Sequence, residues 1–126
     1  MTALVIDNSG DIVVVGTSYN LLMNNHDYTI LKYDSDGTLL WSEQFDGSAG
    51  GHDIASSVTV DASDNIYVTG GSEGTTTLVD YCTLKYSSSG TFQWEARYDH
   101  QNMYDGAVSV KISGSLIVVT GGSGND

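Results

Sequence analysis

The chain contains no proline, a single cysteine and only four cationic side chains among its 126 residues. One cysteine cannot form an internal disulfide framework or a multi-cysteine zinc site. Sixteen acidic residues leave a formal net charge of −12. Contacts to phosphates require clustered Lys and Arg, so nucleic acid is not an expected partner, and an anionic membrane surface is disfavoured for the same reason.

Long hydrophobic runs are also absent from the sequence. The longest apolar stretches, such as residues 12–15, are far shorter than the roughly 18 residues that a membrane span requires. The first seven residues carry neither the basic region nor the apolar core of a secretory signal peptide. We therefore expect no membrane insertion, and we expect either a cytosolic protein or a piece of a longer one.

Internal repetition is the main feature that the sequence does have. When the sequence is shifted by 53 residues, residues 27–46 fall on residues 80–99 with ten of the twenty positions identical. A third copy begins near its C-terminal end, where residues 117–123 match residues 66–72 at six of seven positions. Self-similarity at a fixed period identifies a repeat architecture. The chain therefore holds two full copies and the first half of a third.

Each full copy is predicted to form four short strands. Apolar, β-branched and aromatic residues alternate with a period of 2, and Gly, Asn, Asp and Ser clusters bound each run. The expected strands cover residues 4–6, 12–15, 28–33 and 39–45, then 55–60, 66–69, 81–86 and 91–98, then 107–112 and 116–120. Four antiparallel strands in about 53 residues are typical of a propeller blade. We predict an all-β fold of antiparallel four-stranded β-propeller blades, about two and a half in number.

The expected domain is one partial β-propeller over residues 1–126. Its blades are predicted at about residues 3–46 and 55–99, with a half blade at about 107–123. Propellers usually close with four to eight blades. The chain is therefore predicted to associate with missing blades of a parent chain, or to complete a ring by self-association.

Glycines recur at two positions of the repeat. Gly37 and Gly90 fall in the hairpin between the third and fourth strands, where a tight turn needs a positive φ. Gly16, Gly70 and Gly121 are expected to end the second strand of each copy, where the chain turns out of the sheet.

Large side chains also repeat in the third and fourth strands. Trp41 and Trp94 are too large to hide inside one thin blade, so we expect them to pack against the neighbouring blade. Lys32 and Lys85 are expected to lay their stems along aromatic rings and to pair with a nearby Asp, the alternative being contact with an anion or a quinone. Cys82, a threonine in the first copy, is expected to be a small strand residue rather than a nucleophile.

One motif carries a family resemblance. Residues 55–70 follow the pattern Ala-x-x-Val-x-Val-Asp-x-Ser-x-Asn-Ile-Tyr-Val-Thr-Gly, and residues 80–94 follow Asp-Tyr-x-x-x-Lys-Tyr-x-x-x-Gly-x-x-x-Trp. Both segments resemble the bacterial tandem β-propeller repeats of the SBBP-like, seven-bladed type found in secreted and cell-surface proteins. The resemblance covers essentially the whole chain. It implies an extracellular or cell-surface location and no catalytic residue.

A weaker resemblance links the chain to quinoprotein-like propellers, whose blades also carry Gly-x-x-x-Trp. Residues 37–41 and 90–94 follow this pattern. The chain lacks the paired cysteines and the basic pocket residues that such dehydrogenases place around the quinone. We therefore expect no organic cofactor in this chain.

Three acidic turns could hold a metal. Asp7 and Asp11 in the first copy, and Asp61 and Asn65 in the second, belong to turns with oxygen atoms at alternate positions, as in calcium loops, and residues 34–37 form a third such turn. None of them has the following Gly and bidentate Glu of an EF-hand loop. The same residue types dominate ordinary turns because they cap their own backbone. The sequence leaves both interpretations open, an ordinary turn or a weak Ca²⁺ site.

Two loops are the expected places for a partner to bind. The loop at residues 18–26 joins the second and third strands, and the loop at residues 46–53 joins the first copy to the second. Long loops on one face of a rigid scaffold commonly carry binding specificity. The candidate contact residues are Tyr19, Leu21, Leu22, Met23 and His52.

These observations favour a non-enzymatic propeller segment that acts as a scaffold or binding platform in a larger secreted or cell-surface bacterial protein. No Gly-x-Ser-x-Gly nucleophile motif occurs. One alternative is a fragment of a quinoprotein-like or hydrolytic propeller enzyme whose catalytic residues lie outside this chain. A second is a propeller that binds carbohydrate through loop Asp, Asn and Tyr residues. The expected ligand is accordingly a protein or a glycan.

Overall fold

Ten β-strands and no helix make up residues 2–124, the part of the chain that this computed structural model describes. The strands form three antiparallel sheets in chain order. These are β1 (Ala3–Ile6), β2 (Ile12–Asn20), β3 (Asn25–Tyr33) and β4 (Leu39–Phe45); β5 (Asp53–Val60), β6 (Ile66–Glu73), β7 (Val79–Tyr86) and β8 (Phe92–Tyr98); and β9 (Tyr104–Ser113) and β10 (Leu116–Gly124). The predicted all-β fold of two four-stranded sheets and a half sheet is confirmed. Residues 1, 125 and 126, part of the expected domain at 1–126, lie outside the described residues.

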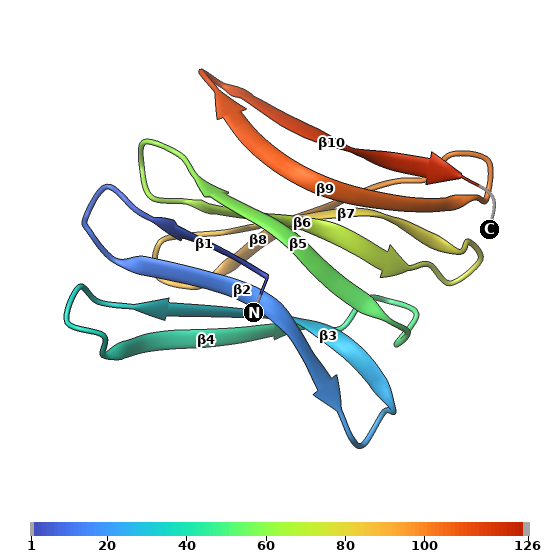
Figure 1. Cartoon of the computed structure of the whole chain (residues 1–126), viewed down its shortest axis with the longest axis horizontal. Helices are drawn as coiled ribbons and strands as arrows, with labels where there is room; N and C mark the ends of the chain where they lie inside the picture. The colour runs from blue at the N-terminus through green and yellow to red at the C-terminus, as the bar shows by residue number, and fades with distance from the viewer. Residues whose placement is uncertain (1, 125–126) are drawn as a thin grey trace.

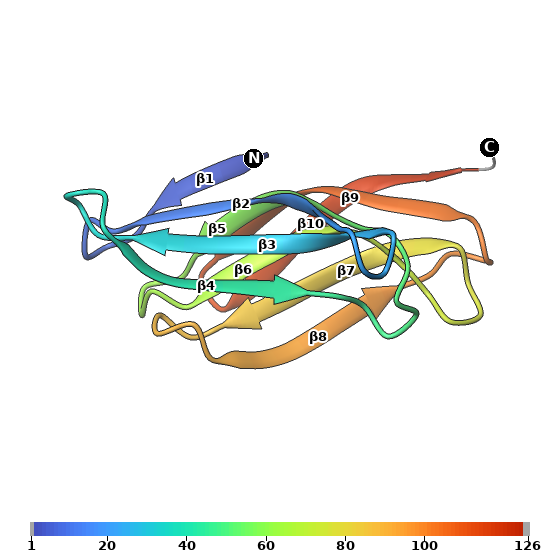
Figure 2. The ribbon, with the colours of Figure 1, turned by 90° about the horizontal axis from the view of Figure 1, so that it is seen from below.

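The three sheets follow one another in space as they do in the sequence (Figure 1). β5 contacts the first three strands of the first sheet, and β9 contacts β5, β6 and β7 of the second. The fourth strands β4 and β8 lie along one side of the molecule, while β1 lies along the opposite side (Figure 2). The sheets do not close into a ring. Among the described residues there is no helix of the length and apolarity that a membrane crossing would need.

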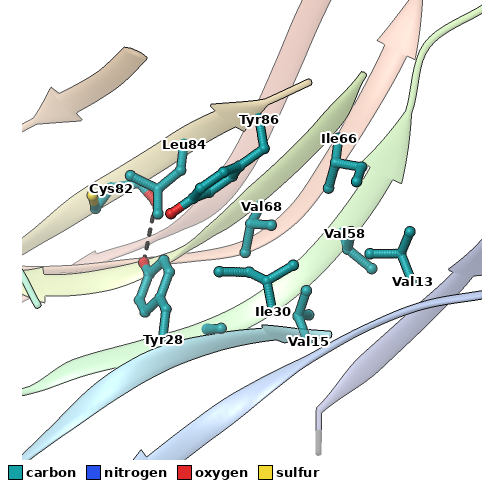
Figure 3. Close-up of a cluster of buried hydrophobic side chains, with 11 residues drawn as sticks. Val13, Val15, Tyr28, Ile30, Val58, Ile66, Val68, Cys82, Leu84 and Tyr86 are labelled. Carbon is teal, nitrogen blue, oxygen red and sulfur yellow. Dashed lines mark hydrogen bonds between the residues drawn. The ribbon is translucent and has the colours of Figure 1, made fainter. Parts of the chain in front are cut away.

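The main core lies between the first and second sheets (Figure 3). Strand alternation sends every second side chain to this interface, so each sheet contributes one apolar face. The buried members are Val13, Val15, Tyr28 and Ile30 from the first sheet, and Ala55, Val58, Ile66, Val68, Cys82, Leu84 and Tyr86 from the second. A single blade could not bury these residues alone, which is why the repeats must stack.

The second strand of each sheet is longer than predicted, and the expected strand ends at Gly16, Gly70 and Gly121 are wrong. β2, β6 and β10 all continue past these glycines. A Cβ atom at Gly70 would collide with the carbonyl oxygen of Ile54 and would lie 2.7 Å from the Tyr28 hydroxyl of the preceding sheet. The glycine therefore admits a close backbone and side-chain approach inside a strand, rather than ending the strand.

The two hairpin glycines adopt the predicted conformation. Gly37 and Gly90 both have φ of 86°, in turns that each close with a backbone hydrogen bond of 3.0 Å. Trp41 lies against the second of these hairpins and donates from Nε1 to the Ser88 carbonyl at 3.2 Å. The predicted packing between blades is therefore confirmed for Trp41. Trp94 instead packs against Tyr67 of its own sheet, because the third sheet ends at β10 and has no such hairpin among the described residues.

Cys82 supplies a chemical probe of this packing. Its side chain is fully buried, and burial raises the pKa of its thiol to about 12 from 9.0. Because of that shift, the fraction of Cys82 present as thiolate at neutral pH is roughly a thousandfold lower than for a free cysteine. The thiolate is the form that reacts. We expect the folded chain to resist alkylation by iodoacetamide at neutral pH and the unfolded chain to react fully, as read by mass spectrometry. Labelling of folded protein at the rate of free cysteine would contradict the packing of β7.

Candidate functional site

The two loops predicted to bind a partner lie side by side. Asn25, at the start of β3, donates from Nδ2 to the carbonyl of Gly50 at 3.1 Å and to Asp46 Oδ1 at 3.3 Å. The Nδ1 atoms of His26 and His52 are 3.0 Å apart. Residues 18–26 and 46–53 therefore form one surface at the end of the first two sheets.

An apolar tip projects from this surface. Leu21, Leu22 and Met23 are 85%, 95% and 65% exposed. The tip is held in shape by Asn20, whose Oδ1 accepts hydrogen bonds from the backbone of Leu22 at 3.1 Å and of Met23 at 3.3 Å. Asn24 closes the turn with φ of 57°, a conformation that Asn tolerates better than most residues. Three adjacent apolar side chains on a braced turn are typical of an interaction site.

Three rings lie beside the tip. Tyr19 and His26 are 5.0 Å apart between ring centroids, and His26 and His52 are 5.1 Å apart. Tyr19 and His52 were both predicted as contact residues, and His26, which connects them, was missed. Its signal in the sequence is weak because the second repeat has a valine at this position. A shallow pocket of about 250 Å³ extends the surface from His52 over Ile54 and Val108.

Asp7 and Asp11, two of the predicted Ca²⁺ ligands, already face a cation. Lys32 Nζ lies 2.7 Å from Asp7 Oδ2 and 3.2 Å from Asp11 Oδ2. Burial lowers the pKa of Lys32, but hydrogen bonds to the two carboxylates outweigh this and raise it. The predicted pairing of Lys32 with a nearby Asp is confirmed. For Lys85 the same prediction is wrong, since its Nζ lies 5.3 Å from the ring centroid of Tyr67 and forms no ion pair within the described residues.

The other two predicted ligands, Asp61 and Asn65, hold their own turn together. Asp61 Oδ1 accepts from the backbone of Ser63 and Asn65, and its Oδ2 accepts from Asn65 Nδ2 and the Tyr67 hydroxyl, all at 2.9–3.0 Å. Burial raises the pKa of Asp61, but these hydrogen bonds outweigh it and lower the pKa. The geometry explains both turns without an ion, and Ca²⁺ binding at the four residues stays a prediction.

Two other carboxylate clusters form where neighbouring sheets meet. Each holds three aspartates with one ligand oxygen apiece, all within 4.8 Å of one another. The first consists of Asp27, Asp46 and Asp53, and the second of Asp80, Asp99 and Asp105. We name them the first and second seam clusters. A signal was present in the sequence, because the 53-residue shift places Asp27 on Asp80 and Asp46 on Asp99.

One comparison with known proteins gives a match. Residues 40–75 match the family model of a β-propeller repeat, SBBP. The matched segment runs from β4 through β5 and β6 into the turn that follows β6, so it crosses from the first sheet into the second. No curated protein sequence matches the chain.

Proposed function

Because the chain carries a β-propeller repeat of the SBBP family, we propose that it is a non-enzymatic interaction platform within a larger propeller. Its partner is a protein, bound through the apolar tip at residues 21–23. The observation that carries this proposal is the near-complete exposure of Leu21 and Leu22 on a braced turn. The corresponding turn of the second sheet has Thr75 and Thr76 where this turn has Leu22 and Met23.

The surface beside the tip supports the same function. Tyr19 adds an amphipathic ring of the kind enriched at protein interfaces, and His52 belongs to the same surface. The loops rest on two packed sheets, so the contact surface is largely preorganised and loses little conformational entropy on binding. The proposal includes an extracellular or cell-surface location for the parent protein. Digestion of that protein by protease added to intact cells tests the location.

The tip can be tested by substitution. We expect the double variant Leu21→Ser/Leu22→Ser to bind its partner at least about tenfold more weakly, because each buried leucine contributes about 1.5–3 kcal/mol and 1.4 kcal/mol is tenfold in affinity. The immobilised chain is incubated with surface extract from the source cells, retained proteins are quantified by mass spectrometry, and the main one is titrated in purified form.

The matched control is Thr75→Ala/Thr76→Ala, at the corresponding turn of the second sheet, which should bind as the unaltered chain does. Equal recovery of the same proteins by the leucine variant would overturn the proposed role of the tip. Equal loss in the threonine variant would show that the binding does not depend on this loop specifically.

A further inference from the structure

The first seam cluster brings three carboxylates together from two sheets. Asp27 lies in β3, Asp46 directly follows β4, and Asp53 begins β5. Asp27 is 2% exposed and Asp53 is 0% exposed, while Asp46 is open to solvent. The cluster therefore has a buried floor of two carboxylates and an accessible rim.

The protein satisfies only one oxygen of each buried carboxylate. Asp27 Oδ2 accepts from Asn20 Nδ2 at 3.2 Å, and Asp53 Oδ2 accepts from the backbone of Gly47 at 2.7 Å. The Oδ1 atoms of both residues are buried and have no hydrogen-bond partner among residues 2–124. Such a group is costly to bury unless something else supplies the missing interaction. Asn25, whose Nδ2 contacts Asp46, also has a buried Oδ1 without a partner.

No ion pair neutralises this cluster within the described residues. None of its three aspartates forms an ion pair. Arg97 lies nearby, but its Nη2 donates to Ser72 Oγ at 2.6 Å and not to the Asp53 carboxylate. The floor of the cluster therefore has no cation paired directly with it among the described residues.

The second seam cluster repeats the arrangement with one difference. Asp80 and Asp105 are buried with unpartnered Oδ1 atoms, and Asp105 Oδ2 accepts from the backbone of His100 at 2.6 Å, as Asp53 does from Gly47. Here, however, Arg97 Nη1 lies 3.7 Å from Asp80 Oδ2. The repeat places Gln44 at the position of Arg97 in the first sheet. Arg97 supplies a cation to Asp80, whereas the corresponding Asp27 has no paired cation in the part of the chain that the structure describes.

We propose that Asp27, Asp46 and Asp53 bind a calcium ion at the seam between the first and second sheets. All donors are oxygen atoms, which are the ligands of hard divalent cations, and Ca²⁺ accepts six to eight of them in flexible geometry. Oxygens on opposite sides of Ca²⁺ are about 4.6–5.2 Å apart, given bond lengths of about 2.3–2.6 Å. The three cluster oxygens all lie within 4.8 Å of one another, close enough for one ion to contact them all. The Asn25 carboxamide and water at the open rim complete the set.

The experiment titrates the full chain, stripped with EGTA, with CaCl₂ up to about 5 mM, the range in which extracellular modules bind. Calorimetry gives the number of ions bound, and urea unfolding with and without calcium gives the change in stability. We expect calcium to raise the urea midpoint, and Asp27→Asn and Asp53→Asn each to lose one bound ion per chain. Both variants should fold without calcium, because each removes a like charge from the cluster, and circular dichroism checks this.

Asp36→Asn is the matched control, since it makes the same chemical change at an exposed turn, and it should bind calcium as the unaltered chain does. Asp61→Asn tests the turn site expected from the sequence and should also retain the ion. The proposal is overturned if the unaltered chain binds no calcium. It is overturned equally if both seam variants keep every ion, or if only Asp61→Asn loses one.

Discussion

Replacing Tyr28 with alanine should lower the free energy of unfolding by about 3–5 kcal/mol, the range for truncating a fully buried aromatic side chain. Tyr28 belongs to the first sheet but reaches into the second, where its hydroxyl donates to the Cys82 carbonyl at 3.1 Å (Figure 3). Its ring also packs against Phe45 at 5.7 Å between centroids. Burial raises the pKa of Tyr28 well above 10.0, so the hydroxyl remains a donor under ordinary conditions.

Two variants separate the contributions of the ring and the hydroxyl. Tyr28→Phe keeps the ring and should cost about 0.5–1.5 kcal/mol, the worth of one hydrogen bond. Tyr81→Ala makes the same truncation one repeat later, at a partly exposed side chain, and should cost less than Tyr28→Ala. Urea unfolding followed by circular dichroism measures all three. If Tyr28→Ala were no more costly than Tyr28→Phe, the interface between the first two sheets would not depend on this ring.

Gly90→Ala should be clearly more destabilising than Gly37→Ala, although the two glycines occupy the same turn of successive repeats. Both have φ of 86°, so each alanine pays about 1–2 kcal/mol for a left-handed backbone. At Gly37 the added methyl group meets nothing within 4 Å, whereas at Gly90 it would lie 2.9 Å from the Trp41 ring. Overpacking adds about 1–3 kcal/mol, which brings the expected total for Gly90→Ala to about 2–5 kcal/mol.

Both variants are compared by urea unfolding, and the Trp41→Ala background supplies a double-mutant cycle. Without the indole ring, Gly90→Ala should cost no more than Gly37→Ala. A difference between the glycines that persisted in this background would place its cause outside the Trp41 contact. Equal costs in the unaltered chain would mean that the ring moves aside freely.

The sheets and hairpins could be predicted because their determinants are local. Strand periodicity and turn residues lie within a few positions of one another, and Gly37 and Gly90 adopt the expected φ. The reason for a glycine at position 70 lies in residues that are distant in the sequence. A glycine inside an apolar run has the same appearance whether it ends a strand or admits a neighbour, and only the packing of Tyr28 decides between the two.

The two repeat lysines differ in ion pairing because a residue in a distant turn differs between the repeats. Lys32 and Lys85 have nearly the same sequence neighbours, yet only Lys32 reaches a carboxylate pair. In the second repeat Asp11 is replaced by Asn65, and the carboxylate of Asp61 is occupied by Asn65 and Tyr67. Lys85 then lies over the Tyr67 ring. A prediction from strand three alone could not include the partner supplied by the turn between strands one and two.

The sequence predicted the loops of the candidate site but not the two seam clusters. The apolar sequence of residues 21–23 and the length of the loop marked the tip directly. Asp27 and Asp53 are 26 positions apart and meet only because two sheets pack face to face. The sequence shows that Asp27 recurs as Asp80 in the second repeat. Recurrence alone, however, does not distinguish an aspartate that the repeat needs for its structure from one that binds an ion.

The contact between Trp41 and the Gly90 hairpin gives the stack of sheets a polarity. A tryptophan of one sheet locks onto the hairpin of the sheet that follows it, and the reverse contact does not occur in the described chain. Within the described residues, Trp94 contacts no hairpin of a following sheet, and the Gly37 hairpin contacts no tryptophan of a preceding one. A further sheet that makes the same contact, from this chain or another copy, must therefore add head to tail. Its hairpin would contact Trp94, or its tryptophan would contact the Gly37 hairpin.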